Sequence, residues 1–165
     1  MPALTALIER RAAWMRERQL EDWEGWSSSA AMMAARAART RSPAWVLEHA
    51  EGAVVGCTTV SDRPLDEGWT AAEREETALY LHTTVTDPAW RHCWPGAVLA
   101  AWALRRAATS GTTWVRRACT SDGLLRYYRD AQGFALVRTV RGEHTVTHLL
   151  ARHATTADWS AATPT

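Results

Sequence analysis

A strand-like run, a turn that contains an arginine and a glycine, and a helix-like run follow one another in the middle of the chain. The strand covers Ala78 to Thr86, the turn covers Arg91 to Gly96, and the helix covers Val98 to Ala108. The amides in the first turn of a helix have no partner in the chain, and the helix dipole favours an anion there. This order of elements predicts a strand–turn–helix unit that can hold a phosphate group.

The chain has 165 residues, which suits one domain with a sizeable hydrophobic core. We expect that domain to cover residues 1–154 and a loose tail to cover 155–165. The formal net charge of +1 argues against nucleic acid and anionic membrane as partners. Because the sequence shows neither a signal-peptide pattern nor an apolar run of about twenty residues, we expect a cytoplasmic protein.

The three cysteines, Cys57, Cys93 and Cys119, lie far apart and show no zinc-ligand spacing, so we expect no metal site. Cys57 and Cys119 fall in apolar strand-like runs, which favours buried free thiols. Ten tryptophans are many for this length, and we expect most of them in the core.

Hydrophobic periodicity predicts elements in the order ααββ(loop)βαβαββ. Before the middle unit we expect two helices and a hairpin, over Leu4–Trp26, Ala30–Arg39, Ala44–Ala50 and Ala53–Val60. Ser27–Ser29 is expected to separate the two helices and to cap the second one. Thr70 and Glu73 have capping-box spacing. After the middle unit we expect a strand, a helix and a hairpin, over Thr113–Cys119, Asp122–Ala131, Phe134–Val140 and Glu143–Leu150. This interleaving favours an α/β (α+β) fold with helices packed on one mixed sheet.

Two motifs carry a resemblance to a known family. Arg91 and Gly96 match a signature that reads Arg or Gln, two residues, Gly, one residue, then Gly or Ala. Tyr128 precedes Gly133-Phe134, at a slightly longer spacing than in that family. With these motifs and this element order, the chain resembles the GCN5-related N-acetyltransferase (GNAT) family over roughly Ala44–Leu150. The resemblance implies a mixed, mostly antiparallel sheet flanked by helices.

Two features depart from the family pattern. Trp94 stands where the signature has its first glycine, a residue that permits a positive φ and a close approach of the backbone to a ligand. The family begins with a strand before its first helix, and no strand-like run precedes Leu4. We therefore expect that first strand to be missing or very short.

The resemblance implies acetyl-CoA (coenzyme A) as the cofactor, with its pyrophosphate on the turn. Arg91 would add positive charge, and four backbone N–H groups would face the phosphates, those of Trp94, Gly96, Ala97 and Val98. In the family a strand amide polarises the thioester carbonyl, and by position this role falls to Thr84, Val85 and Thr86. The alternative is a plain strand–turn–helix in which Arg91 is a surface charge.

The resemblance also implies a tyrosine acid, here Tyr128. A phenol is protonated at neutral pH, so Tyr128 can protonate the leaving thiolate. Leu124 and Leu125 lie one helical turn earlier, which predicts that they share an inward face with Tyr128. The alternative is a packed core aromatic whose hydroxyl is satisfied.

His82 is the expected base for the incoming ammonium, because imidazole titrates near neutral pH. It shares the strand face of Thr84, near the position expected for the acetyl group. A water chain is one alternative base, and other side chains are Glu75, Glu76, His144 and His148.

The acceptor amine is expected to meet Asp22, Trp23 and Trp26, with the carboxylate attracting a cation and the indoles stacking on it. Further candidates for the same role are Glu24, Asp66 and Trp69. The alternative is a solvated acidic loop whose tryptophans cover the core.

These observations predict an acetyl-CoA-dependent N-acetyltransferase that acts by direct attack of a primary amine of a small molecule or peptide. One alternative is a non-catalytic GNAT-like module that binds a protein partner, since Trp94 and an uncovered sheet edge depart from the catalytic pattern. Another is a transferase that uses a longer acyl-CoA or an aminoacyl-tRNA acceptor. A homodimer is the common default for such a protein.

Overall fold

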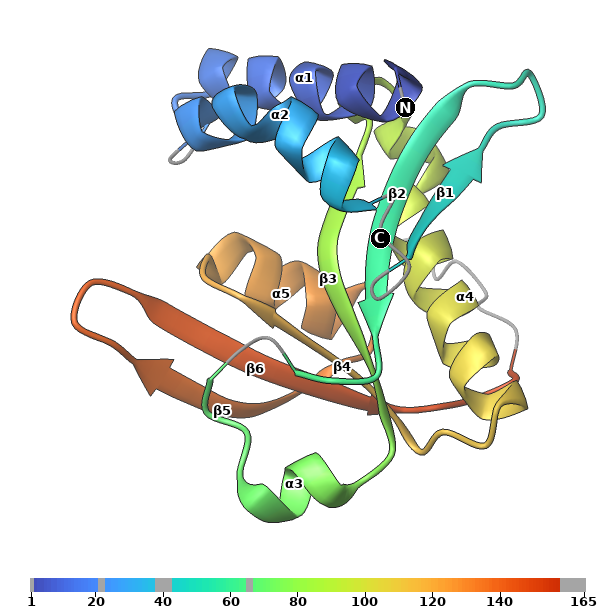
Figure 1. Cartoon of the computed structure of the whole chain (residues 1–165), viewed down its shortest axis with the longest axis vertical. Helices are drawn as coiled ribbons and strands as arrows, with labels where there is room; N and C mark the ends of the chain where they lie inside the picture. Colours follow the sequence, from blue (N-terminus) through green and yellow to red (C-terminus); the bar gives the residue numbers. More distant parts are fainter. Residues whose placement is uncertain (1, 21–22, 38–42, 65–66, 158–165) are drawn as a thin grey trace. The chain divides into compact units, whose positions relative to one another are not determined.

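The computed structural model describes residues 2–20, 23–37, 43–64 and 67–157 (Figure 1). Its first half holds α1 (Pro2–Glu17), α2 (Trp23–Ala37), β1 (Ala44–Glu48), β2 (Val54–Ser61), α3 (Ala71–Glu75) and β3 (Ala78–Thr86). Its second half holds the 3-10 helix η1 (Pro88–Cys93), α4 (Pro95–Thr109), β4 (Trp114–Cys119), α5 (Asp122–Asp130), β5 (Ala135–Arg141) and β6 (Val146–His153). Within these ranges, no helix is long and apolar enough to span a bilayer.

Six strands of the described residues form one sheet in the order β1-β2-β3-β4-β6-β5. β3 and β4 are parallel, whereas the pairs β1–β2, β4–β6 and β5–β6 are antiparallel. The predicted mixed sheet with flanking helices is therefore confirmed. In the part of the chain that the structure describes, α1 is the first element.

The chain divides into two compact units. Unit 1 contains Met1–Val60 and Thr83–Leu99, and unit 2 contains Ser61–His82 and Ala100–Thr165. Both β3 and α4 contribute residues to each unit. The phosphate-binding candidate therefore falls in unit 1, and Tyr128 falls in unit 2.

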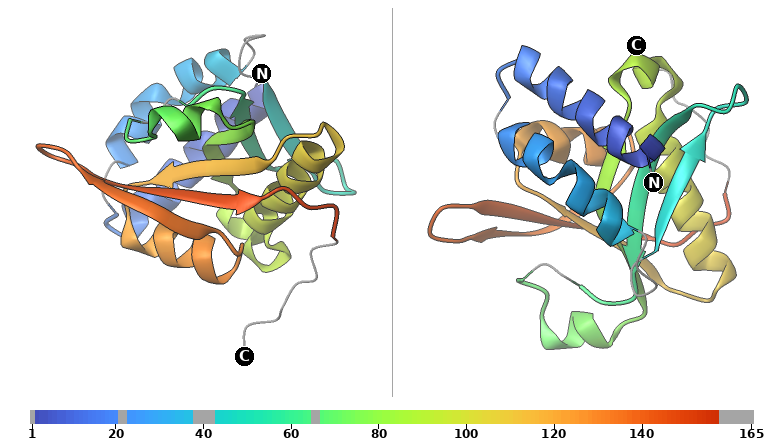
Figure 2. Two further views of the ribbon diagram at one scale, coloured as in Figure 1. Left: turned by 90° about the horizontal axis from the view of Figure 1, so that it is seen from below. Right: turned by 45° about the horizontal axis from the view of Figure 1, so that its top comes forward.

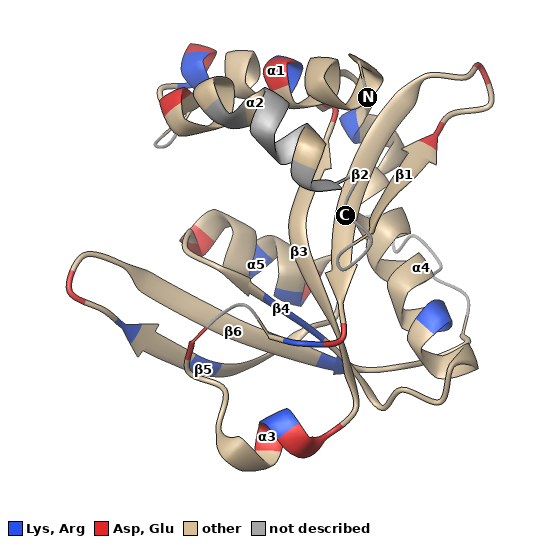
Figure 3. Ribbon diagram, in the orientation of Figure 1, with Lys and Arg blue, Asp and Glu red and all other residues tan. Residues whose placement is uncertain are grey.

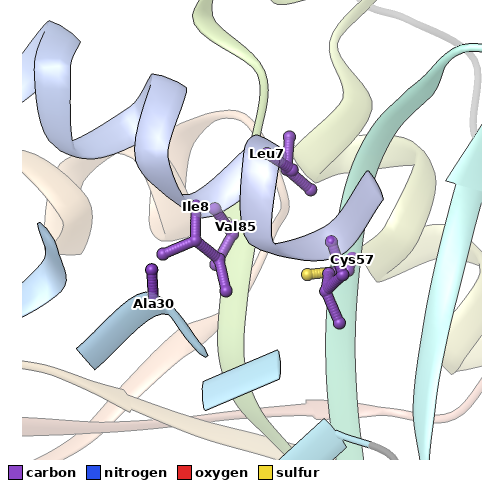
Figure 4. Packing of buried hydrophobic residues seen from close by; sticks show 6 residues of the cluster. Leu7, Ile8, Ala30, Cys57 and Val85 are labelled. Atoms are coloured by element: carbon purple, nitrogen blue, oxygen red, sulfur yellow. The ribbon is translucent and has the colours of Figure 1, made fainter. Parts of the chain in front are cut away.

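The core of unit 1 lies between its two helices and its strands. Figures 1 and 2 show α1 and α2 lying side by side. Figure 4 shows their side chains meeting those of β2 and β3, with the cluster formed by Leu4, Leu7, Ile8, Ala30, Cys57 and Val85. Each fully buried aliphatic side chain of this kind contributes about 1.5–3 kcal/mol of transfer free energy. The apolar residues at helical spacing in α1 thus face the core, as the sequence predicts.

The first helix ends earlier than the sequence pattern predicts. α1 ends at Glu17 because Gln19 adopts a left-handed conformation with φ of 52°. The Leu20 N–H then donates to the Met15 carbonyl at 3.0 Å, which closes a Schellman-type turn. The prediction of one continuous helix over Leu4–Trp26 is therefore wrong, because the helix ends at Glu17 and Trp23–Trp26 belong to α2.

The predicted cap at Ser27–Ser29 is also wrong. These serines lie inside α2, which begins at Trp23. The Ser28 hydroxyl donates to the Gly25 carbonyl at 3.3 Å, so this serine satisfies its hydrogen bond within the helix.

Unit 2 follows the local signals of the sequence more closely. The capping box at Thr70 and Glu73 is present, and β3 has the predicted bounds. The last strand begins at Val146, three positions later than expected, because the Gly142 N–H donates to the Thr145 carbonyl and closes a longer turn. Buried residues of its core cluster come from three segments and are Trp69, Ala78, Tyr80 and Leu149.

Candidate functional site

The segment before α4 is anchored by Asp87, which is only 5% exposed. Its carboxylate accepts a hydrogen bond from the Ala89 N–H at 3.0 Å and so caps η1. The other carboxylate oxygen accepts from Arg10 Nε of α1 at 2.7 Å. Pro88, with its fixed φ, opens the 3-10 helix. The Asp-Pro pair and α1 together fix the start of the turn.

Trp94 has a backbone conformation that glycine adopts without strain. Its φ and ψ are 51° and 46°, in the left-handed region. This conformation costs an L-residue roughly 1–2 kcal/mol. The Trp94 N–H donates to the Arg91 carbonyl at 3.1 Å, which closes η1 directly before Pro95 opens α4. The turn therefore contains a bulky residue in a left-handed conformation.

The first turn of α4 leaves fewer open amides than the sequence suggests. The N–H groups of Ala97 and Val98 donate to the Trp94 carbonyl at 2.9 and 3.1 Å. For the Gly96 N–H, the described residues provide no hydrogen-bond partner, although Gly96 is buried. Arg91 is exposed. Of the four predicted phosphate-facing amides, Gly96 thus stands out as the one that is not engaged within the chain.

The strand that precedes this turn has an unusual backbone. Thr83 has a φ of 42°, which is an outlier for a β-branched residue. The Thr84 hydroxyl forms a 2.9 Å hydrogen bond with the Thr58 hydroxyl. Burial raises the pKa of the Cys57 thiol to about 11, while a hydrogen bond from the Val85 backbone acts in the opposite direction. The assignment of carbonyl polarisation to Thr84, Val85 and Thr86 stays a prediction.

Tyr128 is the buried residue of α5, whose N-cap Ser121 accepts from the Leu124 N–H at 3.2 Å. Leu124 is 38% exposed, so the prediction that it shares an inward face with Tyr128 is wrong. Tyr127 is half-buried, and its ring centroid lies 5.9 Å from that of Tyr128. Burial raises the pKa of Tyr128, and the charge of Arg117 opposes this shift. The phenol is therefore protonated at neutral pH, as an acid must be.

His82 is half-buried and stacks on Tyr80, with ring centroids 6.3 Å apart and planes 7° apart. The Tyr80 hydroxyl accepts from Arg116 Nη1 at 3.1 Å. The role of His82 as the base stays a prediction.

The four other side chains that were candidate bases lie in different surroundings from one another. Glu76 forms an ion pair with Arg116, and Glu75 is exposed. His144 lies in the turn before β6, so its predicted place on the last strand is wrong. His148 is buried, with its ring bonded to the Thr139 hydroxyl at 3.0 Å and facing Asp122 at 3.4 Å.

Solved structures with the same arrangement of elements are acetyltransferases. A GNAT-family acetyltransferase from Listeria monocytogenes 4b F2365 has a TM-score of 0.69 and 18% identity, over 90% of this chain and 86% of that chain. The chain has the GNAT acetyltransferase fold. The aminoglycoside 6′-acetyltransferase type Ii matches with a TM-score of 0.64 and 15% identity, over 95% of this chain and 94% of the other.

A further structure with the GNAT fold is an aminoglycoside 6′-N-acetyltransferase in complex with coenzyme A. Its TM-score is 0.63 at 12% identity, over 95% of this chain and 92% of that chain. No family model matches the sequence, and no curated protein matches it. At these identities the likeness establishes the fold.

The residues predicted to bind the acceptor amine are only partly described. Asp22 and Asp66 lie outside the described residues. Trp23 and Trp26 are in the first turns of α2 rather than in a loop. The guanidinium of Arg16 lies 5.7 Å from the Trp23 ring centroid.

Two of the predicted tryptophans pack against the chain itself. Trp26 packs against the unit 1 core cluster. Trp69 is 4% exposed, and the cation over its ring is the chain's own Arg116, at 4.8 Å. The expectation that Trp69 stacks on a substrate cation is therefore wrong.

Sequence reasoning missed two buried polar residues next to Tyr128. The guanidinium carbon of Arg117 lies 3.4 Å from the Tyr128 ring centroid. Arg117 Nη1 donates to Gln132 Oε1 at 2.7 Å, and the two residues are 3% and 2% exposed. The available signal was an Arg116-Arg117 pair inside an apolar strand, a place where charge is normally excluded.

Proposed function

We propose that the protein is an N-acyltransferase that moves an acetyl group from acetyl-CoA to a primary amine of a small molecule or peptide. The observation that carries this proposal is the turn before α4. It has a left-handed Trp94, an exposed Arg91 and a Gly96 whose N–H has no partner among the described residues, within a GNAT fold.

The residues of the turn fit a pyrophosphate. A helix N-terminus with an unengaged N–H favours an anion, and Gly96 provides that N–H in the first turn of α4. Arg91 is exposed and adds a guanidinium suited to phosphate oxygens. The similar structure with bound coenzyme A supports this choice of cofactor.

The bound cofactor would supply an acyl carbon that carries a thiolate leaving group. As the amine replaces the thiolate on the acyl carbon, Tyr128 would donate its phenolic proton to the leaving sulfur and would then regain a proton from water. His82, directly or through water, takes the proton that the incoming ammonium must lose. A backbone amide of the Thr84, Val85 and Thr86 segment would stabilise the developing oxyanion.

The acceptor class comes from the similar structures and from the chemistry of the reaction. Two of these structures are aminoglycoside 6′-acetyltransferases, so amine-bearing small molecules are the first class to test. Peptide amines with a free N-terminus form the second class.

The test combines cofactor binding with turnover. Coenzyme A and acetyl-CoA should each raise the melting temperature, since a ligand of the native state stabilises it by mass action. A panel of amines with acetyl-CoA, followed by thiol detection, should then reveal an acceptor-dependent release of coenzyme A. An unchanged melting temperature up to millimolar cofactor would refute the transferase and favour a partner-binding module.

A further inference from the structure

The buried Arg117 guanidinium in unit 2 contacts the ring of Tyr128 and the side-chain amide of Gln132. The Arg117 guanidinium of β4 stacks on the Tyr128 ring at 3.4 Å and lies 5.6 Å from the Phe134 ring. Gln132, directly after α5, accepts from Arg117 Nη1 at 2.7 Å and is itself 2% exposed. The hydrogen bond to Gln132 thus helps to hold the Arg117 guanidinium against the Tyr128 ring.

This arrangement has unequal effects on the two protonation states of Tyr128. A cation over a neutral ring gains a modest cation–π interaction, whereas the same cation beside a phenolate gains a charge–charge interaction. Because both groups are buried, solvent screens the second interaction only weakly. The guanidinium therefore favours loss of the phenolic proton more than it favours the neutral phenol.

From this geometry we propose that Arg117, held by Gln132, is a positioning residue that promotes proton donation by Tyr128. The proposal rests on the proposed function, in which Tyr128 protonates the leaving thiolate. Without the guanidinium, burial alone would hold the phenolic proton too tightly for efficient transfer to sulfur. Arg117 offsets that effect of burial.

Two other titratable groups act on Tyr128. Cys119 of β4 and Tyr127 of α5 both oppose ionisation of the Tyr128 phenol, whereas Arg117 favours it. Burial raises the pKa of the Cys119 thiol to about 11, so this thiol is neutral at physiological pH. Arg117 is therefore the charge that governs the acidity of Tyr128.

The experiment measures the ionisation of Tyr128 without cofactor or turnover. The chain contains three tyrosines, so uniform 3-fluorotyrosine labelling gives few fluorine NMR signals, which Tyr→Phe variants assign. Fluorination makes the phenol more acidic and brings its titration into the range where the protein is folded. Arg117→Met should raise the midpoint at position 128 by about one pH unit or more, a tenfold smaller acid constant.

A second variant keeps the test decisive if Arg117→Met does not fold. Gln132→Glu leaves the guanidinium in place but sets a carboxylate against it, so the midpoint at position 128 should also rise. Arg117→Lys should fall between wild type and Arg117→Met, because it keeps the charge but loses the planar stack. Arg116→Met, on the neighbouring position of β4, is the matched control and should move the Tyr80 signal instead.

The outcomes separate this proposal from the proposed function. An unchanged or lowered midpoint in Gln132→Glu and in folded Arg117→Met overturns the role of Arg117, even if Tyr128→Phe abolishes turnover. A raised midpoint supports it, even if Tyr128→Phe keeps full turnover and the proposed function fails. With an active enzyme, the alkaline limb of the turnover profile should move in the same direction as the midpoint.

Discussion

Arg116 and Arg117 are adjacent in β4, and both are buried, at 2% and 3% exposure. Their side chains leave the strand on opposite faces. Arg116 forms an ion pair with Glu76 and lies among aromatic rings, those of Trp69, Tyr80 and Trp114. Arg117 instead stacks on Tyr128 and bonds the neutral amide of Gln132.

The difference between the two arginines separates a structural role from a chemical one. Arg116 also donates to the Glu73 backbone carbonyl, so its contacts connect β4 to α3 and to β3. Figure 3 shows that α3 carries both acidic and basic residues and that β4 carries basic ones. Arg117 instead lies against the ring of a phenol, and its charge acts on that group. Removal of Arg116 should therefore lower the stability of the fold, whereas removal of Arg117 should change the acidity of Tyr128.

The largest expected effect concerns the phenol itself. Tyr128→Phe should lower the turnover number at least about 100-fold, because general acid catalysis is lost. Its affinity for coenzyme A should stay close to that of wild type. Tyr127→Phe, one step around the same helix, is the matched control and should keep most of the turnover. Equal turnover in Tyr128→Phe and wild type would remove Tyr128 from the mechanism.

Loss of the ion pair between Arg116 and Glu76 is expected to lower the stability of the fold. Glu76→Gln leaves the buried Arg116 without its carboxylate and should lower the free energy of unfolding by about 2 kcal/mol, less than for a fully buried pair because Glu76 is half-exposed. Glu75→Gln changes an exposed neighbour and should cost under about 0.5 kcal/mol. Urea denaturation measures both, and equal values would contradict the structural role of the pair.

The α3 contacts also predict a dependence of stability on acid. A hydrogen bond from Arg138, with help from Thr70, lowers the pKa of Glu73 from 4.5 to about 2. A depressed carboxyl pKa stabilises the folded state above the unfolded value and loses that effect as pH falls through the folded value. The melting temperature should therefore drop between about pH 4.5 and 2. Glu73→Gln should flatten this part of the profile, and a profile identical to wild type would refute the assignment.

The smallest expected effect concerns the backbone at Trp94. Trp94→Gly and Trp94→Ala both remove the indole, so their difference reports only the left-handed conformation. The glycine variant should be more stable by about 1 kcal/mol in urea denaturation. If the alanine variant is as stable as the glycine variant, the turn does not require a positive φ at this position.

Local signals in the sequence predicted the elements that local contacts determine. The capping box at Thr70 and the bounds of β3 depend on neighbouring residues and were confirmed. The left-handed residues Gln19 and Trp94 are not glycines, so composition gave no sign of where α1 ends or how the turn is shaped. The Arg117 stack depends on residues from β4 and α5 that only tertiary packing brings together.

The central claim is that the turn before α4 binds the pyrophosphate of an acyl-CoA. The most direct measurement is a calorimetric titration of coenzyme A into wild type and Arg91→Ala. We expect saturable binding with one site per chain, weakened about tenfold in Arg91→Ala because an exposed charged contact to phosphate is lost. Absence of saturable heat in wild type up to millimolar coenzyme A, or equal affinity in the two proteins, would contradict the account.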